Sequence, residues 1–255
     1  MPTRTTALRS LSRITASILV AGGTVATGPA VVGAAASGSP AATSVTRTAG
    51  VPASAHLPTL HRGDSGAAVR TLQNELSGLG YWTGGAADGK FGGLTEQAVL
   101  ALQKTAGLKR DGVAGAQTWA ALAKGVRPAA KSKKGHVIEV DLKHQVLKVV
   151  DKGKVSFALN TSTGSGRKYV SQGSTHIART PAGHFHIYRQ VDGWRHAPLG
   201  LLYRPKYFNG GIAIHGYSSV PAYPASHGCV RVSMAAADWL WDTGKIPMGT
   251  SVWVY

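Results

Sequence analysis

The sequence of 255 residues has little cysteine, few acidic side chains and few long apolar runs. A single cysteine, Cys229, cannot close an internal disulfide bond, so a fold held together by disulfides is excluded. Only 11 aspartates and glutamates stand against 28 lysines and arginines, and the formal net charge of +17 indicates an anionic partner. Beyond the N-terminal region, no apolar stretch is long enough to span a bilayer. The lone thiol is therefore a candidate for chemistry, and a buried apolar cysteine or an intermolecular disulfide is the alternative.

The first 36 residues have the layout of a secretory signal peptide. Arg4, Arg9 and Arg13 precede an apolar run of small residues, and residues 33–36 offer an Ala-x-Ala type cleavage site. The run is rich in glycine, threonine and proline, which favours a cleaved signal over a retained membrane anchor. Residues 37–58 are rich in alanine, serine, threonine and proline, and we predict a disordered tether there.

Residues 59–125 are predicted to fold as a small module of three helices. Apolar residues at helical spacing open the module, and Asp64 or Ser65 is the predicted cap of its first helix. The two later helices share one pattern, an Asp-Gly turn that lies seven residues before a threonine predicted to cap the helix. The two pairs are Asp88 with Thr95 and Asp111 with Thr118.

Beyond a basic linker at residues 126–134, which we expect to be exposed, the pattern changes to short β-runs. The fold class predicted is multidomain: the three-helix module precedes an all-β, sandwich-like domain over residues 135–255, with one short helix. The predicted strands include residues 136–142, 145–150, 154–159, 184–189 and 250–255, the predicted loops are 162–174 and 192–209, and the predicted helix is 234–242 with Ser233 as its cap. The second loop resembles a lid over a peptide groove, and Tyr203 is its candidate substrate contact.

Residues 226–231, Ser-His-Gly-Cys-Val-Arg, surround the lone cysteine with groups that suit thiol chemistry. A thiol reacts as its thiolate, and a neighbouring imidazole can take its proton. Strand alternation puts His215, Cys229 and Arg231 on one face, although it does not exclude His227 as the base. The amides of Gly228 and Cys229 could point at a developing oxyanion. This set of residues is the one that acyl transfer through a thioester requires.

Other interpretations of the same residues stay open. Cys229, His215 and His227 could hold zinc, which would make the protein a metallopeptidase, but a thiol–imidazole pair needs no metal and we predict no cofactor. His184 and His186 form a possible metal pair that lacks a third ligand at a recognisable spacing. The export signal and the lack of a nucleic-acid motif argue against nucleic acid as the anionic partner.

The His-Gly pair at residues 215–216, followed by residues 226–231, resembles the signature of the YkuD-type L,D-transpeptidases of bacterial cell walls. Residues 180–187 resemble the Thr-Pro-x-Gly-x-Phe segment of that family, and the likeness covers residues 135–255. It implies Cys229 as nucleophile, His215 as general base, the Gly216 carbonyl as the group that orients the base, and the Gly228 and Cys229 amides as oxyanion donors. Arg231 stands where many members carry asparagine, and it joins Ser226, His227 and Tyr203 as a candidate substrate contact.

The helical module resembles the peptidoglycan-binding-domain-1 family at Leu72-Gln73, Phe91-Gly92 and Asp111-Gly112-Val113. The two resemblances imply a secreted enzyme of the cell wall, or of the periplasmic side of the envelope, that forms 3→3 peptidoglycan crosslinks on tetrapeptide stems. The implied partners are peptidoglycan stem peptides and glycan, anionic wall polymers and carbapenem-type inhibitors. An L,D-carboxypeptidase that uses water as acceptor and a non-catalytic wall-binding protein are the alternatives.

Overall fold

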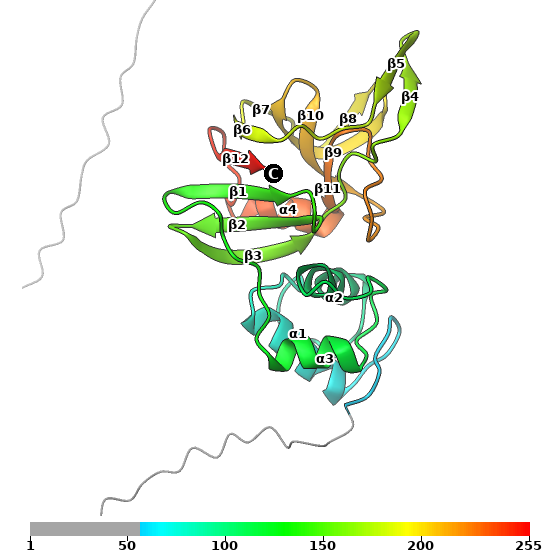
Figure 1. Ribbon diagram of the computed structural model, residues 1–255, viewed down its shortest axis with the longest axis vertical. Helices are drawn as coiled ribbons and strands as arrows, with labels where there is room; N and C mark the ends of the chain where they lie inside the picture. Colours follow the sequence, from blue (N-terminus) through cyan, green and yellow to red (C-terminus); the bar gives the residue numbers. More distant parts are fainter. Residues whose placement is uncertain (1–56) are drawn as a thin grey trace, which may run out of the picture. The chain divides into compact units, whose positions relative to one another are not determined.

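The computed structural model describes residues 57–255 (Figure 1). The predicted signal peptide at residues 1–36, and all but the last two residues of the predicted tether at 37–58, lie outside the described residues. Across residues 57–255, none of the helices combines the length and the apolar character needed to cross a bilayer. Helices come first along this part of the chain, and β-strands with one further helix follow.

The first three helices are α1 (Ala67–Gly78), α2 (Gly93–Thr105) and α3 (Ala116–Ala123). Their apolar faces form one buried cluster, in which Leu72, Leu102 and Trp119 contribute one large side chain from each helix. Each helix starts directly after a glycine, and no side chain caps any of the three. The caps predicted at Asp64 or Ser65, at Thr95 and at Thr118 are therefore wrong, because both threonines lie inside their helices and are buried there.

Each copy of the repeated Asp-Gly and threonine pattern instead supplies hydrogen-bond partners to one buried glutamine side chain. The Gln73 side-chain amide donates to Asp88 Oδ1 at 2.8 Å and to Thr95 Oγ1 at 3.0 Å, and its carbonyl accepts from the Gly89 N–H at 2.8 Å. Each glutamine therefore ties a turn to the helix that follows it. The second copy has the same contacts, from Gln103 to Asp111 at 2.8 Å, to Thr118 at 3.3 Å and from the Gly112 N–H at 2.9 Å.

The strands form two five-stranded sheets and a separate hairpin, and Figure 1 shows the two sheets with helix α4 beside them. The first sheet has the order β3-β2-β1-β12-β6; the second has the order β11-β10-β9-β7, with β8 paired to β9. The hairpin pairs β4 with β5. The bounds are β1 (His136–Asp141), β2 (Val146–Asp151), β3 (Lys154–Asn160), β4 (Lys168–Ser171), β5 (Ser174–Ile177), β6 (Gly183–His186), β7 (Arg189–Gln190), β8 (Trp194–Ala197), β9 (Gly200–Asn209), β10 (Ile212–Tyr217), β11 (Val230–Ser233) and β12 (Ser251–Val254).

One apolar core joins the two sheets and α4 (Met234–Asp242). Ile138 and Val252 enter it from the first sheet, Ile214 and Val230 enter it from the second, and Leu240 enters it from α4. The prediction of a β-rich, sandwich-like fold with a short helix at residues 234–242 is confirmed. The predicted cap of that helix is also correct, since the Ser233 side chain accepts the Ala236 N–H at 3.2 Å.

Two segments predicted as loops contain strands. Residues 162–174 include β4 and the first residue of β5, and residues 192–209 include β8 and the whole of β9. The β4–β5 hairpin is largely exposed on both faces, so no buried face marks it in the sequence. In β9, Pro205 and a run of charged and aromatic residues hide the alternation, because a proline inside a run argues against a strand.

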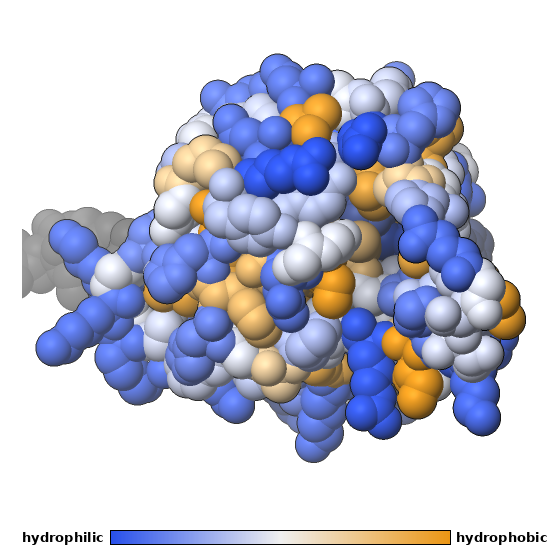
Figure 2. Space-filling view, turned by 90° about the horizontal axis from the view of Figure 1, so that it is seen from above, coloured by the Kyte–Doolittle hydropathy of each residue, from blue (hydrophilic) through white to orange (hydrophobic). Residues whose placement is uncertain are grey.

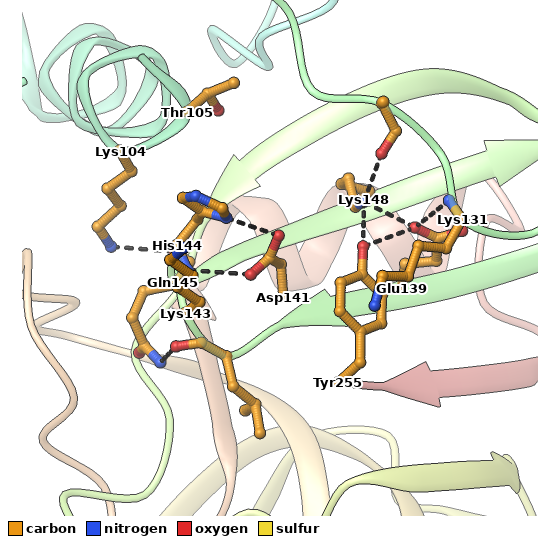
Figure 3. A network of polar contacts seen from close by, with 12 residues as sticks. Lys104, Thr105, Lys131, Glu139, Asp141, Lys143, His144, Gln145, Lys148 and Tyr255 are labelled. Carbon is orange, nitrogen blue, oxygen red and sulfur yellow. Dashed lines mark hydrogen bonds and ion pairs between the residues drawn. The ribbon is translucent and has the colours of Figure 1, made fainter. Parts of the chain in front are cut away.

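Lys104 of α2 is 0 % exposed, and its side chain connects the helices to the sheets through buried hydrogen bonds. Its Nζ donates to the Gln145 carbonyl at 3.0 Å (Figure 3). It also donates to the Thr161 carbonyl at 2.9 Å and to the Asn160 side-chain oxygen. Burial lowers the pKa of Lys104 to about 7, and the charge of Arg110 lowers it further, whereas three acceptors favour the three donors of the ammonium form. Val146 of β2 and Ala158 of β3 extend the helical cluster into the first sheet.

The segment between α3 and β1 was predicted to be an exposed linker, and this is wrong at Ser132, which is buried. The Ser132 N–H and hydroxyl both donate to Glu139 Oε1 at 2.7 Å. Lys148 pairs with the same carboxylate at 2.7 Å (Figure 3). Burial opposes ionisation of Glu139, but the hydrogen bonds from Lys148, Ser132 and Lys131 outweigh it and lower its pKa to about 2. The linker is therefore fixed to the first sheet through one buried carboxylate.

Replacement of Lys104 by methionine tests the contact between the helices and the sheets. The substitution removes the Nζ donor from three buried oxygens, and the Gln145 carbonyl keeps the Thr161 N–H at 3.2 Å. Each of the other two oxygens, on Asn160 and Thr161, costs about 1–3 kcal/mol when the chain does not relax around it. With partial relaxation we expect the free energy of unfolding, measured by urea denaturation, to fall by about 3 kcal/mol. Lys109→Met is the control, because the Lys109 side chain is 84 % exposed. An unchanged urea midpoint in Lys104→Met would contradict this account of the contact.

Candidate active site

The parallel pairing of β10 with β11 places the predicted catalytic groups on one side of the second sheet. Ile214 lies opposite Val230, and His215 lies opposite Arg231. Ile214 and Val230 enter the apolar core, so His215 and Arg231 lie on the other face, as alternation along each strand requires. Cys229 directly precedes β11 and shares the face of Arg231, which makes it a diagonal neighbour of His215 across the two strands.

These residues line a cavity of about 740 Å³, which is large enough to hold a peptide segment. Its walls come from the β4–β5 hairpin, from the β8–β9 turn and from residues 226–231. Figure 2 views the protein from above, toward the end at which Figure 1 places that hairpin, and shows a mainly hydrophilic face with hydrophobic residues between. Cys229, His215, His227, Ser226, Gly228 and Arg231 all line the cavity, and Tyr203 does not.

His215 is held as a neutral base. The residue is 3 % exposed, and its Nδ1 lies 2.9 Å from the carbonyl oxygen of Gly216. A carbonyl can only accept, so Nδ1 carries the proton and Nε2 keeps its lone pair for a proton from the thiol. Burial lowers the pKa of His215 to about 4; the contact with Gly216 opposes this shift and the charge of Arg231 adds to it. The ring is therefore uncharged at neutral pH and able to accept a proton.

Cys229 is a partly exposed free thiol at the edge of β11. Burial raises its pKa, while the Ala213 N–H and the charge of Arg231 act in the opposite direction. Its Sγ lies 3.9 Å from the Gly211 carbonyl oxygen. With a raised thiol pKa and a lowered imidazole pKa, the resting pair is thiol and neutral imidazole, and the charges form only when the proton moves during the reaction.

The turn before Cys229 depends on Gly228. Its φ of 144° lies in the region that favours glycine, and a Cβ at this position would lie 2.8 Å from the Arg179 carbonyl oxygen. The Gly228 N–H donates to Ser226 Oγ at 3.0 Å, and the Ser226 hydroxyl donates to the Cys229 carbonyl at 2.6 Å. The expectation that the Gly228 amide is a free oxyanion donor is therefore corrected, because Ser226 occupies it. Among residues 57–255 we find no acceptor for the Cys229 N–H, which stays available to an oxyanion.

Two further residues, Thr180 and Gly164, position this turn, and the sequence predicted a role for neither of them. The Thr180 hydroxyl donates to the Gly228 carbonyl at 2.6 Å and accepts the Gly164 N–H at 2.9 Å. A Cβ at Gly164 would lie 2.5 Å from the Ala178 carbonyl oxygen, so only glycine fits there. Thr180 begins the Thr-Pro segment, and the likeness of this segment to a family motif was the available signal.

Tyr203 and His227 lie in different surroundings from those expected. The Tyr203 hydroxyl donates to Asp238 Oδ1 of α4 at 2.8 Å, and its ring packs against the core that joins the sheets. Tyr203 is not among the residues that line the cavity, and its contact with substrate stays a prediction. His227 is exposed and meets the Tyr169 ring edge-on, with 4.8 Å between the ring centroids. It lines the cavity without the buried, oriented position of His215.

Within the described part of the chain, no three of the histidine, cysteine, aspartate and glutamate side chains are grouped as metal ligands. His184 and His186 lie on β6, and the His184 ring stacks on Trp253 with 4.6 Å between the centroids. The geometry around Cys229 is that of a thiol beside an oriented imidazole in a peptide-sized cavity, which is the arrangement of a cysteine acyltransferase.

Comparison with known families agrees with this geometry. Residues 135–254 match the model of the YkuD family, described as the L,D-transpeptidase catalytic domain. Residues 65–122 match the model of a peptidoglycan binding domain.

The chain is also similar to a solved L,D-transpeptidase from Xylanimonas cellulosilytica, with 51 % identity, a TM-score of 0.75, and coverage of 77 % of this chain and 97 % of that one. An L,D-transpeptidase from Stackebrandtia nassauensis is 26 % identical over 77 % of this chain and 94 % of its own, with a TM-score of 0.44. An uncharacterised protein of Kitasatospora aureofaciens is 42 % identical over 81 residues, which are 32 % of this chain and 68 % of that protein. The chain belongs to the YkuD family of L,D-transpeptidases, and it is an enzyme of that class.

The resting protonation state can be tested by alkylation of Cys229 with iodoacetamide, since the chain has one cysteine and every label reports on it. A raised thiol pKa means that thiolate accumulates only at a higher pH than in free cysteine. We therefore expect the alkylation rate to be low from pH 5 to pH 8 and to rise above about pH 9. A cysteine-containing peptide of random structure serves as the reference. A rate that already reaches its plateau below about pH 7 would show a thiolate–imidazolium pair and contradict the neutral resting state.

Proposed function

We propose that this protein is an exported L,D-transpeptidase that forms 3→3 peptidoglycan crosslinks through a thioester on Cys229. One observation carries the proposal: Cys229 and the oriented, neutral His215 share one face of the β10–β11 pair and line one peptide-sized cavity. The matches to the L,D-transpeptidase and peptidoglycan binding families supply the class of substrate.

The first half of the proposed reaction acylates the enzyme. His215 Nε2 takes the proton of the Cys229 thiol as the sulfur attacks the carbonyl carbon of an L-residue in a tetrapeptide stem. The new oxyanion faces the Cys229 N–H, which is the donor that the turn leaves available. As the C–N bond breaks, the imidazolium returns its proton to the departing D-alanine amine, and the thioester remains on Cys229.

The second half transfers the acyl group. The amine of another stem attacks the thioester carbonyl, and His215 takes the proton that this amine loses. The C–S bond breaks, and the departing thiolate receives the proton from the imidazolium, so the resting thiol and neutral imidazole return. Water in place of the amine would give an L,D-carboxypeptidase from the same intermediate.

The rest of the chain fits a role outside the cell. We propose that residues 1–36, which lie outside the described residues, direct export, and that the helical module holds the enzyme on peptidoglycan. The formal net charge of +17 suits an anionic envelope polymer. A carbapenem-type inhibitor would acylate Cys229 in the same way as a stem peptide, with the opened lactam as the acyl group.

Substitutions at the two histidines separate the proposed base from its neighbour. Cys229→Ala is expected to abolish thioester formation and crosslinking with tetrapeptide muropeptides. His215→Ala is expected to lower the acylation rate by a factor of about 10²–10⁴, because it removes the general base. His227→Ala is expected to have a much smaller effect, and His186→Ala, which lies outside the cavity, serves as the control.

Intact-protein mass spectrometry measures the acyl-enzyme, and mass spectrometry of the muropeptides identifies the products. Crosslinked dimers formed by Cys229→Ala would contradict the proposal. Equal losses in His215→Ala and His227→Ala would show that His215 is not the base. Tripeptides in place of dimers would identify water as the acceptor.

A further inference from the structure

Guanidinium groups line the cavity that holds Cys229 and His215. Arg179, Arg189, Arg195 and Arg231 all contribute to its wall, and within residues 57–255 neither a lysine nor an acidic side chain does. Lysines outnumber arginines in the described part of the chain, so a general excess of positive charge would have placed lysines there as well. The cavity wall therefore carries arginine in particular among the basic residues. The planar guanidinium group of arginine can donate two parallel hydrogen bonds to the two oxygens of a carboxylate.

In the described part of the chain, these four arginines have neither an ionic nor a hydrogen-bonding partner for their side chains. Within residues 57–255, none of them makes an ion pair with a carboxylate or donates a side-chain hydrogen bond, and Arg231 Nε is buried without an acceptor. A buried donor left in this state destabilises the free protein, and a carboxylate from a ligand would satisfy it. Five of the six other arginines among residues 57–255 are paired: Arg62 and Arg204 with carboxylates, and Arg70, Arg110 and Arg127 with backbone carbonyls. The sixth, Arg167, is exposed to solvent.

Aromatic rings hold two of the guanidinium groups in place. Arg231 Cζ lies 4.0 Å from the centroid of Tyr217, and Arg189 Cζ lies 4.8 Å from the centroid of Tyr207. A guanidinium that rests on a ring keeps its N–H edge directed sideways and loses less freedom when an anion binds. The site is therefore organised before the ligand arrives.

The arginines also come from separate parts of the chain. Arg189 lies on β7, Arg195 on β8 and Arg231 on β11, while Arg179 follows the end of β5. A single carboxylate cannot reach groups on four segments around a cavity of about 740 Å³. An extended peptide that carries several carboxylates can reach them, with its reacting carbonyl at Cys229.

We propose that this cavity selects stem peptides with two or more free carboxylates and discriminates against stems in which these groups are amidated. The inference rests on the proposed function, because the same cavity must present the peptide to Cys229. An amide keeps the shape of a carboxylate but loses the charge and one acceptor oxygen, so it cannot accept a bidentate contact from arginine. Selectivity between the two stems follows from the arginines and not from the thiol.

Two synthetic tetrapeptides test this, identical except that one carries free carboxylates and the other carries carboxamides at the same positions. The full-length protein is mixed with each peptide, and the second-order rate constant for thioester formation on Cys229 is measured by intact-protein mass spectrometry. We expect the free peptide to react at least about tenfold faster, since a carboxylate accepts charge-assisted contacts from arginine that a carboxamide cannot. Higher ionic strength should reduce the difference.

Variants assign the preference to the cavity. Arg189→Gln and Arg195→Gln should each slow the reaction of the free peptide several-fold and leave that of the amidated peptide nearly unchanged. Arg167→Gln is the matched control, because it removes the same charge from an exposed arginine outside the cavity wall. Arg189→Lys keeps the charge without the fork, and it should recover only part of the loss.

Three outcomes would overturn the inference: equal rates for the two peptides, faster reaction of the amidated peptide, or an equal loss in Arg167→Gln. If neither peptide acylates Cys229, the proposed function fails separately. The carboxylate preference is then decided by calorimetric titration of both peptides, in which tighter binding of the free peptide supports the inference and equal binding contradicts it.

Discussion

The parallel pairing of β10 with β11 is the constraint on which the active site depends. Its register sets His215 opposite Arg231 and leaves Cys229 just ahead of the strand, while Ile214 and Val230 enter the core. A shift of one residue in the register would exchange the two faces of a strand. The Cys229 thiol would then face the apolar core, and Val230 would face the cavity. Burial of the apolar face therefore determines which side chains face the cavity, and the packing energy of the core holds the reacting groups in register.

The loop that carries Cys229 is supported by a segment that also contacts the helical module. The Arg231 N–H donates to the Ser162 carbonyl at 3.0 Å, and the Thr161 hydroxyl donates to the Arg231 carbonyl at 2.6 Å. The carbonyl of the same Thr161 accepts from Lys104 of α2 at 2.9 Å. A continuous set of buried hydrogen bonds thus runs from the helices to the strand beside Cys229, and the module is part of the support of the candidate active site.

Residues whose burial follows a simple period could be predicted from the sequence. The alternation at His215 and Cys229 gave the correct faces, and Ser233 was read correctly as a helix cap, because each signal is local. The position of Tyr203 could not be predicted, because it depends on the pairing of β8 with β9 in a hairpin that has no marked buried face. The role of Gln73 was equally hidden, because its partners Asp88 and Thr95 are 15 and 22 residues away.

The protonation state of the site follows from the same geometry. His215 is buried with its Nδ1 directed at the Gly216 carbonyl, so the ring is neutral with Nε2 open, and the thiol keeps its proton until substrate arrives. The most direct test is an NMR titration of the free protein with ¹⁵N-labelled histidine. The account predicts that His215 is the Nδ1–H tautomer from pH 5 to pH 8 and gains a second proton only near its lowered pKa of about 4. An imidazolium at His215 at pH 7, or a proton on Nε2 in place of Nδ1, would contradict it.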